Sequence, residues 1–172
     1  MKITPPSKAD YPEFYHTYIG KVTTIDLLPE LKTQLILFQS LFHDLSEDQL
    51  SYRYEKDKWN LKELLIHIID SERVFAYRAL RFGRGDNTPL PGFDQNIYGD
   101  HIKGIERNIE SILDEFEFVR KSTIALFENF NEKDLNNSGE ASGGMVTVRA
   151  IGYMILGHAL HHRLIIEERY LF

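Results

Sequence analysis

Two of the seven histidines in this chain have the spacing of joint metal ligands. His158 and His162 are four residues apart, which places their side chains on one face of a helix with Cβ atoms about 6 Å apart. A helix uses this spacing to present two imidazoles to one metal ion. The same face carries four apolar residues, Met154, Ile155, Ile165 and Ile166. We therefore expect both imidazoles to point into the protein core.

Buried histidines need not bind metal, so a second interpretation stands beside the first. Most histidines on an apolar face are core or rim residues with ordinary hydrogen-bond partners. Two neutral imidazoles in a core must each find such a partner, and protonating either of them there is costly. A shared metal ion removes both problems. The spacing alone leaves the two interpretations open.

A third ligand is available in His67, which lies between Leu64 and Ile68 at the margin of an apolar helical stripe. Side chains from facing helices converge in the core of a bundle, where metal sites are commonly built. Taken by itself, His67 is better explained as a core residue. The other four histidines are expected at the surface or at an edge: His16, His43, His101 and His161.

Three neutral histidines would leave the +2 charge of a metal ion uncompensated. Such a site keeps an open position and lowers the pKa of bound water towards 7, which suits a reactive centre. A closed structural site usually has four ligands, often thiolates, and the chain has no cysteine. Glu63, Asp70 and Glu72 flank His67 and are candidate proton acceptors. The alternative for these three acids is a solvated helix surface, and the catalytic residues stay unassigned.

The elements that must position these residues are helices. Apolar side chains recur every three or four residues in four segments, 29–45, 60–82, 101–130 and from 147 onward. Asn60 with Glu63 forms a capping box at the start of the second segment. A short N-terminal helix is expected at 11–18, and strand-like alternation is brief, at 145–148. The pattern predicts an all-α four-helix bundle in a single domain, 1–172.

Composition narrows the class of function. The formal net charge of −6 argues against nucleic-acid binding and against docking on anionic lipid. Without cysteine there can be no disulfide, iron–sulfur cluster or cysteine nucleophile in the chain. We find no apolar run of membrane-spanning length and no secretory signal, so we expect no membrane partner and a cytoplasmic location.

Two further features could contribute to a site. Segment 85–99 has prolines and Phe93-Asp94-Gln95, so it is either a pocket rim with Asp94 or Gln95 near substrate, or a rigid connection, which we favour. Four arginines, Arg73, Arg78, Arg81 and Arg84, could attract an anionic substrate. We expect most of them to pair with nearby acids instead.

Several separated motifs resemble those of the DinB/YfiT-like superfamily. They are 58–63 (KWNLKE), 67–73 (HIIDSER), 78–80 (RAL), 85–95 (GDNTPLPGFDQ), 157–162 (GHALHH) and 168–170 (ERY). The resemblance extends over most of the chain, roughly from Tyr11 to Tyr170, in the expected order. Agreement of several separated motifs is far more specific than any one of them.

The resemblance implies a four-helix bundle with long crossover loops and unusual connectivity, often assembled as a homodimer. It also implies one divalent metal held by three histidines, here His67, His158 and His162. Zinc and nickel are the expected ions, and iron and manganese are also compatible. Members of the superfamily are metal-dependent hydrolases or transfer low-molecular-weight thiols such as bacillithiol or mycothiol. Metal-bound water or thiolate would then attack a small-molecule substrate.

Two other classes of function stay open at this point. One is a non-catalytic metal-binding bundle that serves in a stress response or as an interaction module. The other is a plain helical dimer whose histidines are only core residues. Since the chain has no cysteine, a thiol transferase would need its thiol as a cosubstrate.

Overall fold

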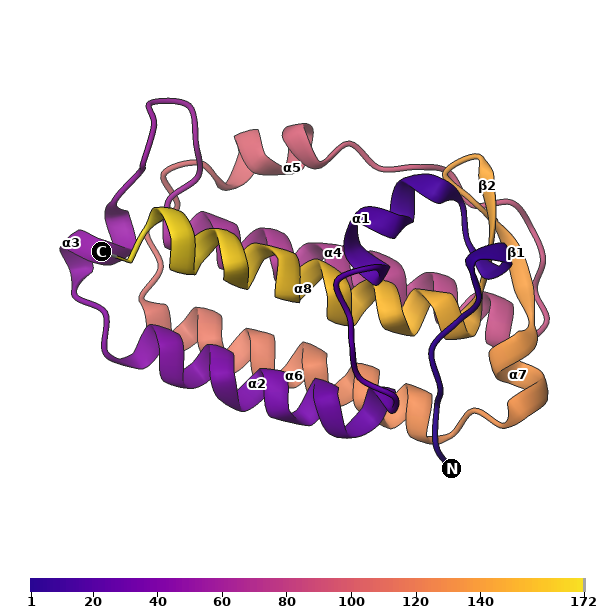
Figure 1. Ribbon diagram of the computed structural model, residues 1–172. Coiled ribbons are helices and arrows are strands. Elements are labelled where there is room, and N and C mark those ends of the chain that lie inside the picture. The colour runs from indigo at the N-terminus through magenta and orange to yellow at the C-terminus, as the bar shows by residue number, and fades with distance from the viewer. Residues whose placement is uncertain (172) are drawn as a thin grey trace.

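Four long helices form the body of the protein (Figure 1). The computed structural model describes residues 1–171. The helices are α2 (Leu27–His43), α4 (Leu61–Gly83), α6 (Ile109–Glu128) and α8 (Val148–Arg169). Both α4 and α2 pack against α6 and α8, so α2 and α4 occupy opposite corners of the bundle. The predicted all-α four-helix bundle is confirmed.

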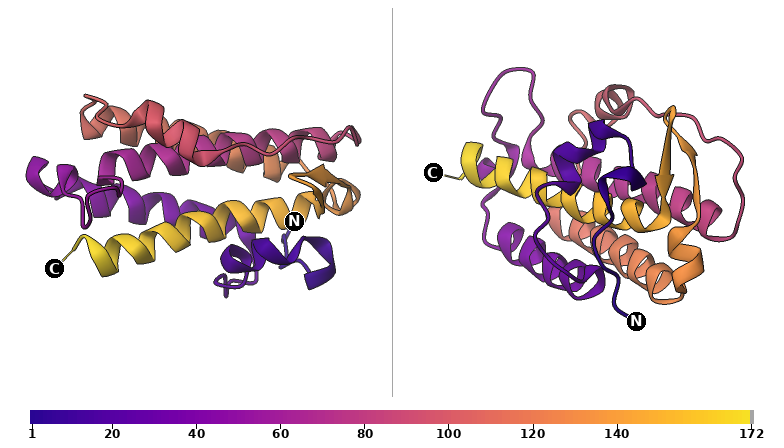
Figure 2. Two further views of the ribbon diagram at one scale, coloured as in Figure 1. Left: turned by 90° about the horizontal axis from the view of Figure 1, so that it is seen from above. Right: turned by 45° about the vertical axis from the view of Figure 1, so that its right-hand side comes forward.

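The connectivity follows from the directions of the helices. In Figures 1 and 2, α4 and α6 run the same way, and α2 and α8 run the opposite way. The chain must therefore return along the bundle between α4 and α6. This long crossover contains α5 (Gln95–Ile102), which packs on α4. The expected long crossover is thus present. Part of α5 lies in segment 85–99, which was expected to be a loop.

Helix α8 is the most enclosed of the four. Every residue of 148–159 is buried, because α2, α4 and α7 (Glu132–Asn136) pack on it and the short α1 (His16–Ile19) covers another side. The covering segment differs from the predicted helix over 11–18. It consists of two 3₁₀ turns, η1 (Lys8–Asp10) and η2 (Glu13–Tyr15), followed by α1. Pro12 precedes η2 in an extended conformation, which rules out a continuous helix from residue 11.

The starts of α4 and α8 agree with the sequence pattern. The Asn60 side chain accepts a hydrogen bond from the Glu63 backbone N–H, and the Glu63 carboxylate accepts one from the Asn60 N–H. The predicted capping box is therefore confirmed. At the start of α8, the Thr147 hydroxyl accepts from the Ala150 N–H. Among the described residues, no helix is both long enough and apolar enough to cross a membrane.

The predicted helix over 101–130 is wrong at its beginning. Helix α5 ends at Ile102, and Gly104 adopts a φ of +74°, which a continuing helix does not allow. Helix α6 then starts at Ile109, where the Asn108 side chain accepts from the Ser111 N–H. Ile105, which matched the apolar spacing, lies in this connection and is exposed. The remaining short helix, α3 (Glu47–Ser51), precedes α4.

A small β-hairpin precedes α8 and was only partly visible in the sequence. Strand β1 (Ser138–Ala141) pairs antiparallel with β2 (Gly144–Thr147). Ser142 and Gly143 form the two-residue turn, both with positive φ, as a type I′ turn requires. The Leu90 N–H donates to the Glu140 carbonyl and the Ser142 N–H donates to the Leu90 carbonyl, which ties the hairpin to the crossover after α4.

Candidate metal centre

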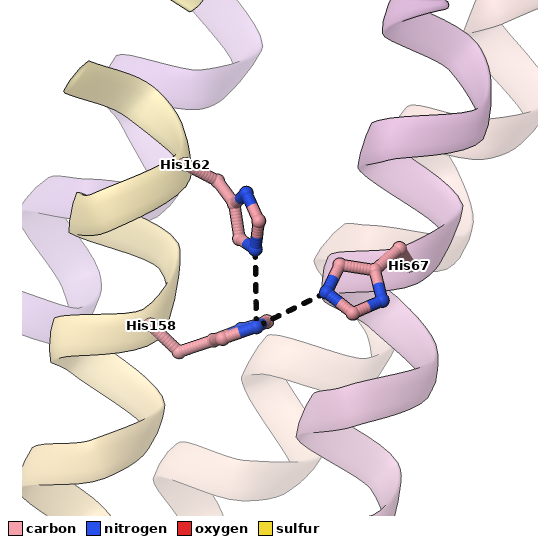
Figure 3. Close-up of side chains that lie close together, drawn as sticks. All are labelled: His67, His158 and His162. Carbon is pink, nitrogen blue, oxygen red and sulfur yellow. Dashed lines mark hydrogen bonds between the residues drawn. The ribbon is translucent and has the colours of Figure 1, made fainter. Parts of the chain in front are cut away.

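Three histidines converge between the neighbouring helices α4 and α8 (Figure 3). The Nε2 atom of His158 lies 3.2 Å from Nε2 of His67 and 3.2 Å from Nε2 of His162. One ligand atom from each residue lies within 4.8 Å of the other two. The i, i+4 spacing on α8 places His158 and His162 together, and the packing of α4 against α8 brings His67 next to them. The structure thus brings together the three histidines that the sequence singled out.

The donor geometry fits a shared cation better than hydrogen bonding alone. An imidazole nitrogen has either one proton to donate or one lone pair with which to accept. The Nε2 atom of His158 therefore cannot form two full hydrogen bonds with its two neighbours. In a tetrahedral site with metal–nitrogen distances of about 2.0–2.1 Å, ligand nitrogens lie roughly 3.3 Å apart. The observed separations of 3.2 Å match that value.

Burial keeps the three imidazoles neutral and their lone pairs available. His67 and His158 are each 4% exposed and His162 is 9% exposed. Desolvation lowers the pKa of His67 from 6.5 to about 4. Desolvation, together with the neighbouring histidines, also lowers the pKa of His158 and of His162 well below 6.5. A metal ion is bound by neutral imidazoles, so this protonation state suits it.

Aromatic rings enclose the cluster. The Trp59 ring lies 4.6 Å from the His67 ring, and the Tyr18 ring lies 5.2 Å from the His158 ring, measured between centroids. Phe75 meets His158 edge-on at 5.8 Å. Burial raises the pKa of the half-buried Tyr18, so its hydroxyl keeps its proton at neutral pH. The rings therefore restrict water around the histidines.

Neither Trp59 nor Tyr18 was predicted from the sequence to contribute to a site. Trp59 stands one residue before the cap of α4, and the Tyr170 hydroxyl donates to its carbonyl across the fold. Only its membership of the 58–63 motif hinted at its importance. For Tyr18 there was no usable signal, because its position depends on how the short α1 docks on α8.

The other four histidines lie outside the cluster. His16, His43 and His101 are exposed, as predicted. His161 is half-buried, and its ring packs on Tyr18 and His162 without joining the three converging nitrogens. The prediction that His161 lies at an edge is therefore confirmed.

The acids that flank His67 are engaged elsewhere. The Glu63 carboxylate is bound by Arg53 and by the Gly104 N–H, and Glu72 pairs with Arg120 inside the bundle. Asp70 is half-buried beside Arg73. For Glu63 and Glu72 the solvated-surface interpretation is wrong, because both are almost fully buried. Their ion pairs with Arg53 and Arg120 assign them structural roles.

Two cavities reach the cluster from different sides. One, of about 260 Å³, is lined by His158 together with Tyr18, Ser71, Phe75 and Arg78, and we call it the His158 cavity. The other, of about 340 Å³, is lined by His162 together with Trp59, Asp57, Asn96 and Asp100, and we call it the His162 cavity. Small molecules therefore have room next to two of the three histidines.

The crossover contributes to the first of these cavities. Gln95 lines the His158 cavity, whereas Asp94 caps α5 by accepting from the Asn96 N–H. Gln95 thus belongs to the rim of the cavity, whereas Asp94 serves the connection between helices. Of the four arginines, Arg73 pairs with Asp70 and Glu115, and Arg81 pairs with Asp86.

Fold and cluster together define a helical-bundle protein with a candidate three-histidine metal centre. The chain belongs to the DinB superfamily, whose family model matches residues 30–166. It is 25% identical over 150 residues to an Oceanobacillus iheyensis protein named "Putative metal-dependent hydrolase OB0413", covering 83% of this chain and 84% of that protein.

A solved structure shares the fold. It is described as "YfiT from Bacillus subtilis is a probable metal-dependent hydrolase with an unusual four-helix bundle topology". The TM-score is 0.72 at 16% identity, and the match covers 95% of this chain and 89% of that chain. At this TM-score the two proteins share the four-helix bundle fold.

Proposed function

We propose that this protein is a metal-dependent hydrolase of a small molecule, with His67, His158 and His162 as the ligands of one divalent ion. The convergence of three buried Nε2 atoms on one point carries the proposal. The O. iheyensis relative, by its name, supports the same class of activity. A bound divalent ion at an open three-histidine site would supply Lewis acidity and make a nucleophile available near neutral pH.

The protein's own groups orient the substrate and handle protons. Tyr18, whose ring packs edge-on against His158, keeps its hydroxyl proton and can donate it to a substrate oxygen in the His158 cavity. Carboxylates that can accept a proton line the His162 cavity instead, at Asp57 and Asp100. Phe75 and Trp59 exclude bulk water from the histidines, which strengthens electrostatic interactions there.

A second candidate function is transfer of a low-molecular-weight thiol to an electrophilic small molecule. The presence of two cavities, one at His158 and one at His162, favours it, since a transferase must hold a thiol and its acceptor together. The thiol would be a cosubstrate, because the chain has no cysteine. Hydrolysis needs only one of these cavities to bind substrate.

The metal is proposed to be zinc or nickel, both of which imidazole nitrogen suits. Iron is compatible with the same donors, whereas manganese prefers oxygen ligands. We also propose that the protein acts as a cytoplasmic homodimer. Large apolar side chains exposed on the bundle, such as Ile36 at 65% and Phe118 at 70%, are available for such contact.

Elemental analysis of protein purified without a His-tag or metal resin tests the metal site. We expect about one metal ion per chain in the wild type and none in the His67→Ala, His158→Ala and His162→Ala variants. His161→Ala is the matched control, since His161 lies on the same helix but outside the cluster. Absence of metal in the wild type, even after incubation with divalent ions and dialysis, would overturn the proposal.

Activity assays separate the two reactions. The metal-loaded protein is offered a panel of activated esters and amides, with and without a small thiol. Turnover without thiol supports the hydrolase, and thiol-dependent formation of a thioester, with release of the alcohol or amine, supports the transferase. A fourth protein ligand and no exchangeable water at the loaded metal would instead favour a non-catalytic metal-binding module.

A further inference from the structure

Arg78 differs from the other arginines of α4. Its side chain is 2% exposed, and Nη2 donates to the Pro91 carbonyl and the Ser142 hydroxyl, each at 3.0 Å. Nη1 is buried and has no hydrogen-bond partner among the described residues. Neutral oxygens and aromatic rings surround this guanidinium, with Phe75 and Phe93 about 6 Å away. Within the described part of the chain, no carboxylate forms an ion pair with it.

A buried guanidinium without an anion is energetically unfavourable. Buried charges in proteins are normally paired, because removing a charge from water costs several kcal/mol unless an opposite charge compensates for it. Arg120 illustrates the usual solution, since it is equally buried and pairs with Glu72. The position of Arg78 is therefore suited to an anion that comes from outside the chain.

The surroundings of Arg78 form a site for such an anion. Arg78 lines the His158 cavity, and none of the residues lining this cavity is an aspartate or glutamate. Ser71 lines it too, and its buried hydroxyl also has no partner among the described residues. Much of the remaining wall is aromatic: Phe14, Tyr15, Tyr18, Phe75 and Phe93.

The sequence of α4 aligns these groups with the histidine cluster. His67, Ser71, Phe75 and Arg78 follow one another at intervals of four, four and three residues, so they share one face of the helix. At 1.5 Å per residue, Arg78 lies about 16 Å along the axis from His67 and about 10 Å from Ser71. His158, from α8, lines the cavity from the other side.

We propose that the His158 cavity binds a small organic anion with an aromatic or flat apolar body, its anionic group held by Arg78 and Ser71. The aromatic walls hold the body of the ligand, which extends from Arg78 towards His158. That this ligand is the substrate rests on the proposed function. The binding itself does not, because neither Arg78 nor Ser71 belongs to the metal cluster.

Binding of benzoate, phenyl phosphate and neutral benzamide to the full-length protein tests the proposal, with the metal content of every sample recorded. We expect both anions to bind at least about tenfold more tightly than benzamide, as loss of one charge-assisted hydrogen bond implies. The preferred anion distinguishes a carboxylate from a phosphate ligand. Equal affinity for benzoate and benzamide would overturn the proposal.

Variants locate the anion. Arg78→Met should weaken anion binding at least about tenfold without changing metal content, and Ser71→Ala should weaken it less. Arg84→Gln, an exposed arginine near the end of α4, is the matched control and should leave binding unchanged. Anion binding that survives Arg78→Met but disappears in His158→Ala would mean coordination to the metal, and would overturn the proposal.

A measurement on the wild type covers the case in which Arg78→Met does not fold. Benzoate should shift the backbone amide NMR signals of Ser71, Phe75 and Ser142, and leave those of Asp57 and Asp100 unchanged. Shifts confined to the His162 cavity would contradict the assignment. If the protein binds no metal yet shows the expected shifts, the anion site stands while the proposed function fails.

Discussion

Gly157 lies directly against the backbone of Tyr18. A methyl group on its Cα would come within 2.4 Å of the Tyr18 carbonyl oxygen and 3.2 Å of the Ile19 nitrogen. This close approach lets α1 dock on α8 at the residue next to His158, and it places the Tyr18 ring edge-on to that imidazole. The absence of a side chain at position 157 thus positions an aromatic wall of the candidate site.

Gly157→Ala is therefore expected to destabilise the protein by about 1–3 kcal/mol, since α1 or α8 must shift to admit the methyl group. Urea unfolding followed by circular dichroism measures the change. Gly92→Ala is the control, because a methyl group there meets only an ordinary contact at 3.5 Å. A loss below about 0.5 kcal/mol in Gly157→Ala, within the range of neutral substitutions, would contradict this packing.

The Glu72–Arg120 pair should contribute to stability without contributing to metal binding. Arg120 is 0% exposed, and its guanidinium donates to Glu72 and to the Gln34 side chain. Glu72→Gln leaves a buried charge uncompensated, so we expect a loss of about 3–5 kcal/mol with unchanged metal content. Thermal unfolding and elemental analysis check the two parts.

Two controls sharpen that experiment. Glu117→Gln removes a carboxylate that pairs with Lys121 at the surface of α6, and it should cost less than about 1 kcal/mol. The double variant Glu72→Leu with Arg120→Met removes both buried charges and should recover much of the loss. Metal loss in Glu72→Gln would show that Glu72 acts on the cluster after all.

The Arg53–Glu63 pair predicts a specific loss of stability in acid. Burial by itself raises the pKa of Glu63, but hydrogen bonds from Arg53 and from the Gly104 and Asn60 amides outweigh it and hold the pKa below 4.5. A carboxylate with a lowered folded-state pKa stabilises the protein above its unfolded-state pKa. This stabilisation disappears as the pH falls through the folded-state pKa.

Urea unfolding at about pH 6 and about pH 4 tests this sign. The wild type should lose more stability between the two values than Glu63→Gln, which cannot titrate at this position. Glu106→Gln changes an exposed residue between α5 and α6, and this control variant should retain the pH dependence of the wild-type stability. Equal pH dependence of wild type and Glu63→Gln would mean that the ion pair is not formed in solution.

The sequence predicted what local spacing determines. The i, i+4 relation of His158 and His162 is a property of one helix, and the capping box at Asn60 lies within four residues, so both follow from the order of the residues alone. The start of α6 was missed because apolar spacing continued through Ile105, while the positive φ of Gly104 interrupts the helix. Asn108, a good N-cap residue, was the available signal.

Tertiary placement determined the rest. Arg78 resembled its neighbours in sequence, and most of these arginines were expected to pair with acids. Within residues 1–171 no acid pairs with it, and its hydrogen-bond partners, Pro91 in the crossover and Ser142 in the hairpin, approach it only in the folded chain. Similarly, the residues next to Glu72 in the sequence do not distinguish it from an exposed acid, because its partner Arg120 lies 48 residues later.

Trp59 gives the cluster an optical reporter. It is the single tryptophan of the chain, and its ring centroid lies 4.6 Å from that of His67. Nickel or copper bound by the three histidines should quench its fluorescence, because open-shell ions quench excited aromatic rings at contact distance, whereas zinc should quench far less. Quenching should saturate at about one ion per chain in the wild type and in His161→Ala. In His67→Ala this quenching at one ion per chain should disappear. Stoichiometric quenching that persists in His67→Ala would place the ion elsewhere near Trp59.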